Sequence, residues 1–502
     1  IHGNPKFDWL YNSVPQAGLN GRQIYYPRGK GLGGSSLMNG MIYIRGHGRD
    51  YDNWRQLGLQ GWSYADVLPY FKRSEGSSHR SDVFHDQVGP LKTTPASNYD
   101  EINQLFVQAC VEAGARHNDD FNGAEQVGTG RFDTKVFRGE RLSTNVTYLA
   151  NPPKNLTIQT GAFVHRVLTE GNKAVGVVYW NGKQEVTVRA SRETILSLGV
   201  FESPKALMLS GIGPADHLLQ QGIKPLLDLP GVGADLQDHP NMPLQFGLVD
   251  PDHSYAKYQR IDQAVLLGLR YLLLKSGPGA SPFWSAALFH SLRDSEVPET
   301  ETFFTPMVVR EDSGQEGWNI SSLLNLGRKA LARGKVAAPG VQFDINILQP
   351  KSRGSVKLAS ANPSDHPLID PGYLHPNDLD DLVAGFRHLR EVARQPAFEG
   401  ILTEEISPGS TLTSQKDLRE AVKRDVTTGH HPVSTCRMGP DHDKGAVLDQ
   451  ELRVRGLEGL RVVDCSSFPS QINGNTNAPV IMMAEKAADM ILGRTPLPAA
   501  EI

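Results

Sequence analysis

The chain has 502 residues, which is too many for one simple core and indicates two or three packed units. Hydrophobic residues make up 39% and charged residues 21%, an ordinary mixture for a soluble globular protein. The formal net charge of −4 gives no electrostatic reason to expect a nucleic acid or an anionic membrane as a partner.

The first feature along the chain is a glycine-rich stretch. It reads Pro27-Arg-Gly-Lys-Gly-Leu-Gly-Gly-Ser-Ser-Leu-Met-Asn39. A dinucleotide-binding fingerprint would open a helix after a buried strand, with an acidic residue about twenty positions further on. Asp50 stands near that distance, but Arg22–Pro27 is a poor buried strand. We therefore expect a loop whose backbone lies against a flat ring or a phosphate, and a plain turn is the alternative.

Residues 155 to 199 predict a series of short strands separated by turns such as Asn181-Gly182, a strong hairpin signal. These strands are Leu156–Gln159, Phe163–Leu168, Ala174–Trp180, Glu185–Arg189 and Thr194–Leu198. The pattern indicates a β-meander that leads into a buried strand.

Helices are predicted further along the chain. Ser203-Pro204 can cap and open a short helix that ends at Gly211. Ala264–Leu274 predicts an amphipathic helix, too short for a membrane span and interrupted by Arg270. Longer helices are expected from about Asp378 to Gln395, with Asn377 as the cap, and from Pro479 to Ile491.

The three cysteines are Cys110, Cys436 and Cys465. Their spacing matches no zinc pattern, and an odd number does not suggest a disulfide framework. We expect buried free thiols and no metal site.

Six motifs in order resemble those of the glucose–methanol–choline (GMC) oxidoreductases. The first is Arg28-Gly-Lys-Gly-Leu-Gly-Gly-Ser-Ser36, followed by Asn39 and Tyr43-Ile-Arg-Gly46. The others are Glu202-Ser-Pro-Lys-Ala-Leu-Met-Leu-Ser-Gly-Ile-Gly-Pro214, Pro230-Gly-Val-Gly-Ala-Asp-Leu-Gln-Asp-His-Pro240, Ser352-Arg-Gly-Ser-Val-Lys357, Gly429-His-His-Pro-Val-Ser-Thr-Cys-Arg-Met-Gly439 and Asn473-Gly-Asn-Thr-Asn-Ala-Pro479. One such motif would be weak evidence, but six in order cover nearly the whole chain.

The resemblance implies an α/β fold of mixed α+β type. It would combine an FAD-binding domain of the glutathione-reductase type with an interleaved substrate domain whose antiparallel sheet roofs the flavin. The FAD-binding domain would comprise residues 1–98, 140–240 and 429–502, and the substrate-binding domain residues 99–139 and 241–428.

The family opens with a strand–GxGxxG–helix unit that this sequence does not contain. Ile1–Trp9 resembles the family's sequence some tens of residues after this unit. Either the sequence as given omits the unit or the protein has lost it, and the missing initiator Met favours omission.

The resemblance also implies oxidation of an alcohol by hydride transfer to flavin N5. His431 stands at the family's catalytic base, and Asn475 at a second position that holds His or Asn. An imidazole suits the base because its pKa lies near working pH, and an amide can donate to an alkoxide without titrating. His430 is expected to line the substrate side. In isolation, His431 would more naturally be a surface or core histidine.

By the same resemblance, FAD would contact the glycine-rich loop, one strand and the segment before the last helix. The residues are Arg28, Gly33, Gly34, Ser35, Asn39, Gly40, Val164, Asp464 and Thr476. Some relatives attach the flavin through a histidine immediately before the asparagine of this loop. Met38 occupies that position here, so we expect non-covalent FAD.

Two other functions remain open from the sequence: a lyase that keeps FAD as a structural cofactor, and a non-catalytic truncated form. The expected partners are a small-molecule alcohol and an electron acceptor, either oxygen or another molecule, with no nucleic acid and no membrane. The sequence leaves the alcohol, the acceptor and the cellular location open.

Overall fold

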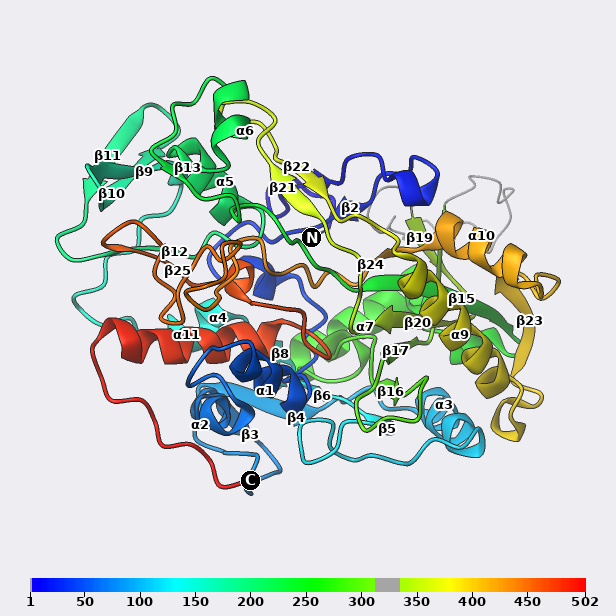
Figure 1. The fold of residues 1–502 in the computed structure, drawn as a ribbon. Coiled ribbons are helices and arrows are strands. Elements are labelled where there is room, and N and C mark those ends of the chain that lie inside the picture. The colour runs from blue at the N-terminus through cyan, green and yellow to red at the C-terminus, as the bar shows by residue number, and fades with distance from the viewer. Residues whose placement is uncertain (1, 312–334) are drawn as a thin grey trace.

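The computed structural model describes residues 2–311 and 335–502, which form a mixed α/β molecule (Figure 1). Its largest sheet joins strands that lie far apart in the sequence. In spatial order these are β23 (Leu402–Ser407), β15 (Pro240–Leu248), β20 (Val341–Ile347), β17 (Thr300–Thr305), β16 (Ala286–His290) and β5 (Gly128–Arg131), with β24 (Thr427–Thr428) also paired to β15. All of these pairs are antiparallel, as expected for the sheet of a substrate domain.

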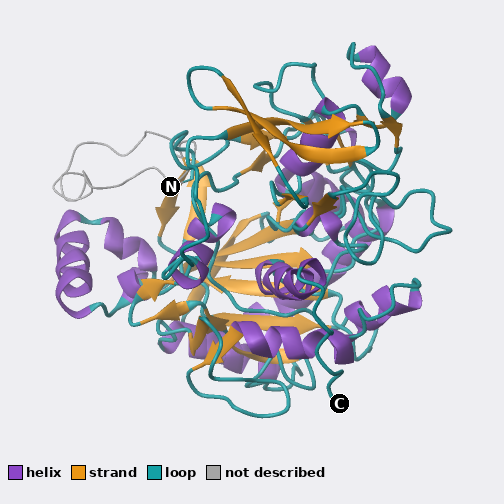
Figure 2. Ribbon diagram, turned by 90° about the vertical axis from the view of Figure 1, so that its left-hand side faces the viewer, coloured by secondary structure: helices purple, strands orange, loops and turns teal. Residues whose placement is uncertain are grey.

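The two faces of this sheet differ in what covers them. Helices α9 (Pro376–Ala393) and α3 (Glu101–Glu112) pack on one face, where Leu244, Phe304 and Phe343 belong to a large apolar core. Figure 2 shows the strands in the interior and the helices on the outside. The opposite face packs through Ala287, Phe289 and Phe303 against Ile42 and Ile44, which follow the glycine-rich loop.

The β-meander predicted before residue 199 is present, except for its first strand. Strands β9 (Phe163–Glu170), β10 (Lys173–Trp180) and β11 (Glu185–Arg189) form an antiparallel sheet, and β12 (Thr194–Leu196) pairs in parallel with β25 (Leu460–Val462). The strand predicted at Leu156–Gln159 is wrong, because this segment is irregular and Leu156 and Ile158 are exposed. It has no neighbouring strand to pair with and no core to face.

The predicted helices are present with shifted ends. Helix α5 covers Glu202–Leu209, and α11 covers Asn477–Ile491, so it begins two residues before Pro479. Helix α9 is capped by His375, whose side chain accepts a hydrogen bond from the Asn377 amide, so the predicted cap at Asn377 is wrong. Pro376 opens the helix at a position where no backbone N–H is needed.

Helix α7 (Ile261–Leu274) matches the segment predicted to be amphipathic, but none of its residues is buried. Across residues 2–311 and 335–502, no helix combines the length and apolar character that crossing a membrane requires.

The remaining elements mostly connect or cover these parts. They are β1 (Tyr11–Asn12), β2 (Tyr25–Tyr26), α1 (Gly48–Gln56), α2 (Tyr64–Ser74), β3 (Glu75–Ser77), β4 (Leu91–Pro95), β6 (Asp133–Thr134), β7 (Val136–Phe137), β8 (Glu140–Arg141), α4 (Thr144–Tyr148), β13 (Ile212–Gly213), α6 (Ala215–Gln220), β14 (Leu227–Asp228), β18 (Val308–Glu311), β19 (Lys335–Ala338), β21 (Ser355–Lys357), β22 (Leu368–Asp370) and α10 (Gln415–Asp425), together with short 3₁₀ turns.

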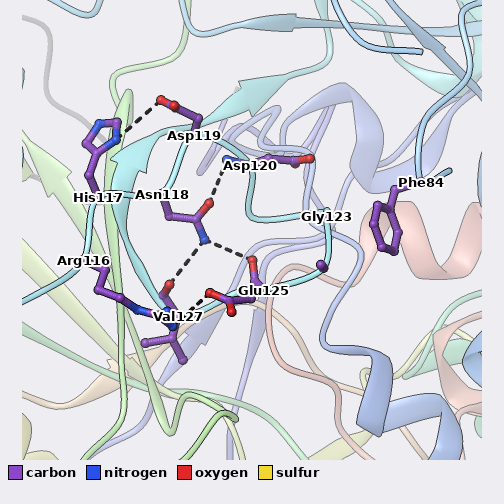
Figure 3. A pocket seen from close by; sticks show the side chains of 10 residues that line it. Phe84, Arg116, His117, Asn118, Asp119, Asp120, Gly123, Glu125 and Val127 are labelled. Carbon is purple, nitrogen blue, oxygen red and sulfur yellow. Dashed lines mark hydrogen bonds and ion pairs between the residues drawn. The ribbon is translucent and has the colours of Figure 1, made fainter. Parts of the chain in front are cut away.

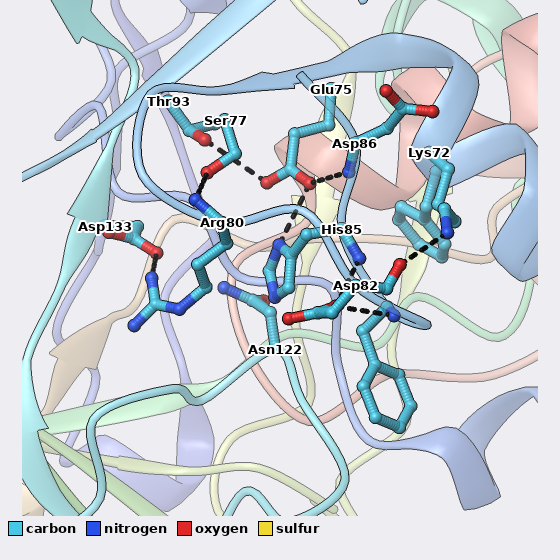
Figure 4. A network of polar contacts seen from close by, with 12 residues as sticks. Lys72, Glu75, Ser77, Arg80, Asp82, His85, Asp86, Thr93, Asn122 and Asp133 are labelled. Atoms are coloured by element: carbon cyan, nitrogen blue, oxygen red, sulfur yellow. Dashed lines mark hydrogen bonds and ion pairs between the residues drawn. The ribbon is translucent and has the colours of Figure 1, made fainter. Parts of the chain in front are cut away.

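A buried ionic network fixes the segment that follows the glycine-rich loop. Arg45, from the Tyr43–Gly46 motif, is fully buried and pairs with Glu75 at 2.6 Å. His85 bonds Glu75 at 3.0 Å (Figure 4) and Asp120 at 2.9 Å. Because a buried charge is tolerated only when it is paired, these contacts hold β3 and two loops in one arrangement.

Candidate active site

The backbone that carries His431 is held from several sides. Its amide donates to Asp238 Oδ1 at 2.9 Å, and its carbonyl accepts from Gln471 Nε2 at 2.9 Å. Gly429, two residues earlier, passes so close to the sheet that a Cβ there would lie 2.6 Å from Asn346 Oδ1 and 3.1 Å from His239 Cβ. Only glycine lets the backbone pass this close to the sheet, and the close contact places His431 at the end of β15.

Asp238 ties these segments together. Its Oδ2 accepts from the Tyr373 hydroxyl at 2.8 Å and from Thr428 Oγ1 at 2.5 Å. Burial raises the pKa of Asp238, although the hydrogen bonds from Thr428 and Tyr373 and the charge of Arg28 act in the opposite direction. The carboxyl group therefore positions the backbone of His431 and does not reach its ring.

The ring of His431 lies between two partners. Its Nε2 is 2.9 Å from Asn475 Nδ2, and its Nδ1 is 3.1 Å from His239 Nδ1. His239 Nε2 lies 3.1 Å from the Ile472 carbonyl oxygen, which can only accept, so this nitrogen carries the proton. In neutral His239 the Nδ1 atom is then the acceptor, and His431 donates from its own Nδ1.

With the protons placed in this way, the lone pair of the His431 ring is on Nε2, beside Asn475. The side chain of His431 is buried, and desolvation, with the nearby rings of His239 and His430 and the charge of Arg28, holds its pKa well below the usual range. A neutral imidazole in this state accepts a hydrogen bond from Asn475 at Nε2, and the same lone pair can accept a proton from a hydroxyl group that takes the place of this bond.

Asn475 lies in the turn before α11, as predicted. Its Nδ2 is taken by His431, but its Oδ1 is buried and has no hydrogen-bond partner among the described residues. Gly474 has φ 139°, and a Cβ there would lie 2.3 Å from Ile44 Cγ2. The turn is thus pressed against the segment that follows the glycine-rich loop.

Lys135 links the start of α11 to that loop. Its Nζ donates to Asn477 Oδ1, and its backbone amide donates to the Met41 carbonyl at 2.7 Å. Burial, with a smaller effect of Arg141, lowers the pKa of Lys135 to about 7. The end of the glycine-rich loop and the last helix, predicted from opposite ends of the sequence, are therefore joined through one residue, by its backbone on one side and its side chain on the other.

His430 differs from its neighbour in every contact. Its φ is 66°, its amide donates to Thr428 Oγ1 at 2.8 Å, and its carbonyl accepts from Arg28 Nη1 at 3.2 Å. Its side chain is exposed, whereas that of His431 is buried.

The glycine-rich loop turns at Gly33 and Gly34, whose φ values are 99° and 53°. Ser35 Oγ accepts from the Gly29 amide at 3.1 Å, and Asn39 Oδ1 accepts from Arg141 Nη1 at 2.9 Å, so both side chains are already bonded within the protein. Gly40 lies against the ring of Trp284. A Cβ added at Gly40 would lie only 2.9 Å from this ring.

The other predicted cofactor residues border the same region. Asp464 accepts from the Gly199 amide at 2.9 Å, Ser203 Oγ at 2.5 Å and the Ser466 amide at 2.7 Å, so its carboxylate joins two loops. Thr476 stands at the cap of α11. Val164 lies in β9 beside Phe163, whose ring is 5.9 Å from that of Trp9.

Sequence reasoning missed several positioning residues. His239 and Asp238 belong to the recognised segment 230–240 but received no role, and Gln471 and Tyr373 were not singled out. Only the Asp-His pair inside a family motif could have drawn attention to the first two.

A hollow of 440 Å³ lies apart from these residues (Figure 3). It is lined by Phe84 and by most of residues 116–127, and neither His431 nor Asn475 lines it. Gln126 of the same loop donates to the Asn473 carbonyl at 2.7 Å, so the loop separates this hollow from the turn before α11.

Residues 8–241 and 350–484 match the N-terminal and C-terminal parts of the GMC oxidoreductase family. The chain is 40% identical to the oxygen-dependent choline dehydrogenase of Brucella ovis over 496 residues, 98% of this chain and 86% of that protein. It also resembles the crystal structure of pyridoxine 4-oxidase from Mesorbium loti, with 27% identity, a TM-score of 0.83 and coverage of 99% and 90% of the two chains. An FAD-dependent oxidoreductase from Chaetomium thermophilum gives 25% identity, a TM-score of 0.84 and coverage of 97% and 90%. The chain therefore belongs to the GMC oxidoreductase family and is an FAD-dependent enzyme that oxidises an alcohol.

Proposed function

We propose that His431 is the general base of this oxidation and that Asn475 holds the reacting oxygen. The observation that carries the proposal is the contact of 2.9 Å between His431 Nε2 and Asn475 Nδ2, with the other ring nitrogen engaged by His239. An alcohol hydroxyl that enters between the two groups would meet an acceptor on His431 and a donor on Asn475, which is what the reaction requires.

In this mechanism the chain supplies proton transfer and charge stabilisation. FAD, when bound, supplies the acceptor for the hydride that leaves the alcohol carbon. His431 Nε2 takes the hydroxyl proton, and Asn475 Nδ2 donates to the oxygen as negative charge develops there. The free backbone N–H groups at the start of α11 favour negative charge in the same region.

The residues around the glycine-rich loop fit a large polar cofactor. Arg28 keeps its Nε and Nη2 atoms buried and without a partner among the described residues, and a Cβ at Gly34 or Gly199 would meet nothing within 4 Å. We propose that Arg28, Gly33, Gly34, Ser35, Asn39, Gly40, Val164, Asp464 and Thr476 hold FAD. The side chains of Ser35, Asn39 and Asp464 are already hydrogen-bonded within the protein. These residues would therefore contact FAD mainly through their backbone groups and through the shape of the surface that they form.

We also propose an FAD-binding unit of residues 1–98, 140–240 and 429–502 and a substrate-binding unit of 99–139 and 241–428. Two separate apolar cores support this division. Some residues pack across this division and bridge the two units. Seven from the FAD-binding unit lie in the second core, and one from the substrate-binding unit lies in the first: Tyr11, Leu19, Ile24, Tyr26, Val200, Phe201 and Leu236, and Leu358. Residues 312–334 lie outside the described part of the chain.

The substrate is a small-molecule alcohol, and the electrons pass to an acceptor. The similar Brucella protein is named for choline, so we propose small amino alcohols as the first substrates to test. Oxygen is the acceptor to test first, beside an artificial electron acceptor.

The test compares two neighbouring histidines in the flavin-loaded enzyme. His431→Ala should lower the rate of anaerobic flavin bleaching by roughly two to four orders of magnitude, the usual contribution of a positioned base. His430→Ala should lower it much less. Visible absorbance before mixing checks that both variants hold flavin. If the two effects are reversed, the assignment of the base is wrong.

A further inference from the structure

The sheet face opposite α9 and α3 carries a row of buried polar side chains. Asn241 on β15, Asn346 on β20 and Glu301 on β17 are directly paired across the strands, and Phe289 on β16 completes the row. Antiparallel partners point to the same side of a sheet, so these side chains lie next to one another.

Glu301 has no counterpart in this row that could neutralise it. Its side chain is fully buried, and both carboxylate oxygens lack a hydrogen-bond partner among residues 2–311 and 335–502. Burial alone raises the pKa of Glu301 well above its usual range. Glu75 is equally buried, but it has Arg45 at 2.6 Å and His85 at 3.0 Å.

Asn346 is also incompletely bonded. Its Oδ1 accepts from Asn241 Nδ2 at 3.1 Å, whereas its buried Nδ2 has no partner in the described part of the chain. Buried polar groups are nearly always satisfied, and exceptions concentrate at functional sites. Two adjacent buried side chains with unused hydrogen-bonding atoms therefore indicate that a ligand binds between them.

This row lies at the proposed active site. Asn346 Oδ1 approaches Gly429, which precedes His430 and His431. Phe289 and Phe303 pack in one cluster with Ile44, and Ile44 presses against the turn that holds Asn475. The indole of Trp284 lies 6.4 Å from the ring of Phe303 and rests on Gly40.

We propose that Glu301, with Asn346 and Phe289 directly beside it and the ring of Phe303 on the same face of the sheet, binds the cationic end of the substrate, an ammonium or quaternary ammonium group. A cation supplies the opposite charge that a buried carboxylate lacks, and aromatic faces attract it further. The inference rests on the proposed function, because it defines the far end of the site whose reacting end is His431.

The experiment uses the flavin-loaded full chain and two alcohols of nearly equal shape. Choline carries a quaternary nitrogen, and 3,3-dimethylbutan-1-ol carries a neutral carbon in its place. The wild-type enzyme should prefer choline in kcat/KM by at least about tenfold, equivalent to about 1.4 kcal/mol. Glu301→Gln keeps the shape and removes the charge, so this ratio should collapse towards one.

Glu296→Gln is the matched control. Its carboxylate is 80% exposed and pairs with Arg49 at the surface, so the wild-type ratio should persist. A wild-type ratio near one, or an unchanged ratio in Glu301→Gln, would overturn the inference.

A second measurement does not depend on turnover. Calorimetric titration with tetramethylammonium should show binding to the wild-type protein and at least tenfold weaker binding to Glu301→Gln. Absence of wild-type binding would also overturn the inference. If the cation binds but no alcohol bleaches the flavin, the proposed function fails while the cation site stands. If neutral alcohols are oxidised without cation preference, only the inference fails.

Discussion

The chemistry of the site depends on which ring nitrogen of His431 carries its proton. The Ile472 carbonyl fixes the proton of His239 on Nε2, and His239 in turn fixes that of His431 on Nδ1. A histidine of the opposite tautomer would present an N–H to the substrate hydroxyl and could not accept its proton. We therefore propose that His239 acts through His431 as a positioning residue.

Replacing His239 tests this dependence. His239→Leu should lower kcat by about 10-fold to 100-fold, the usual effect of losing a group that orients a catalytic or metal-binding histidine. His239→Asn should recover part of the loss, because its side-chain oxygen can still accept from His431 Nδ1. Steady-state kinetics with matched flavin content measure both variants. Equal losses in the two variants would contradict a role in fixing the tautomer.

His85 makes the stability of the fold depend on pH. Burial lowers its pKa, but the hydrogen bonds to Asp120 and Glu75 outweigh this effect and raise it to about 9. Its folded pKa lies above the unfolded value of 6.5, so its contribution is fully present below pH 6.5 and is lost as pH rises through 9. The free energy of unfolding should fall across this window by on the order of 3 kcal/mol.

Urea denaturation of the protein on both sides of the window measures this fall. His85→Gln should flatten the pH dependence, and His117→Gln, at an exposed histidine of the neighbouring loop, should leave it unchanged. An unaltered slope in His85→Gln would show that other groups cause the fall.

Among the secondary structure elements, those with a clear period were predictable from sequence. Strands β9 to β11 alternate, and α9 carries its leucines on one face, so both were predicted with ends shifted by a few residues. The family resemblance implied the large antiparallel sheet, but its individual strands were not located from the sequence. Strands such as Thr300–Thr305 are buried on both faces and carry polar residues inward, which removes the alternation that identifies a strand.

The candidate site was likewise predictable only in part. His431 and Asn475 lie in recognisable motifs, and the structure brings them into contact. The pairing of His239 with His431 spans 192 positions, and nothing local in the sequence indicates it. Glu301 is an ordinary glutamate in the sequence, and its lack of a partner among the described residues is visible only in three dimensions.

The turn between β24 and His431 depends on Gly429. In Gly429→Ala the added Cβ would stand 2.6 Å from Asn346 Oδ1 and 3.1 Å from His239 Cβ, so the turn must shift. A displacement of about 1 Å at the base can lower turnover by about 100-fold, and we expect a loss of that order with flavin retained. Gly268→Ala in α7, where nothing lies within 4 Å, should keep full turnover. Stopped-flow reduction of the flavin compares the two, and normal turnover in Gly429→Ala would show that the turn tolerates the methyl group.

At the scale of the whole molecule, the site lies where the two apolar cores meet. His431 and Asn475 lie within three residues of Val433 and Ile472 of the first core, whereas Asn346 and Glu301 project from the sheet that lines the second. A ligand that touches both sides adds its binding free energy to the stability of the folded chain, about 2.7 kcal/mol at a hundredfold excess over its Kd. We therefore expect the flavin, bound at the proposed site, to stabilise the contact between the two proposed units.

We expect the flavin to be held without a covalent bond. Met38, where some relatives have the linking histidine, is a buried thioether and cannot form an imidazole–flavin bond. His2 lies close in space, but its Nε2 bonds the Met38 carbonyl at 3.2 Å. We therefore expect acid precipitation of the flavin-loaded protein to leave yellow colour in the supernatant, measured by absorbance, and removal of FAD to lower the melting temperature. Colour that stays with the pellet would show a covalent bond, in which case the affinity no longer rests on Arg28 and the glycine-rich loop alone.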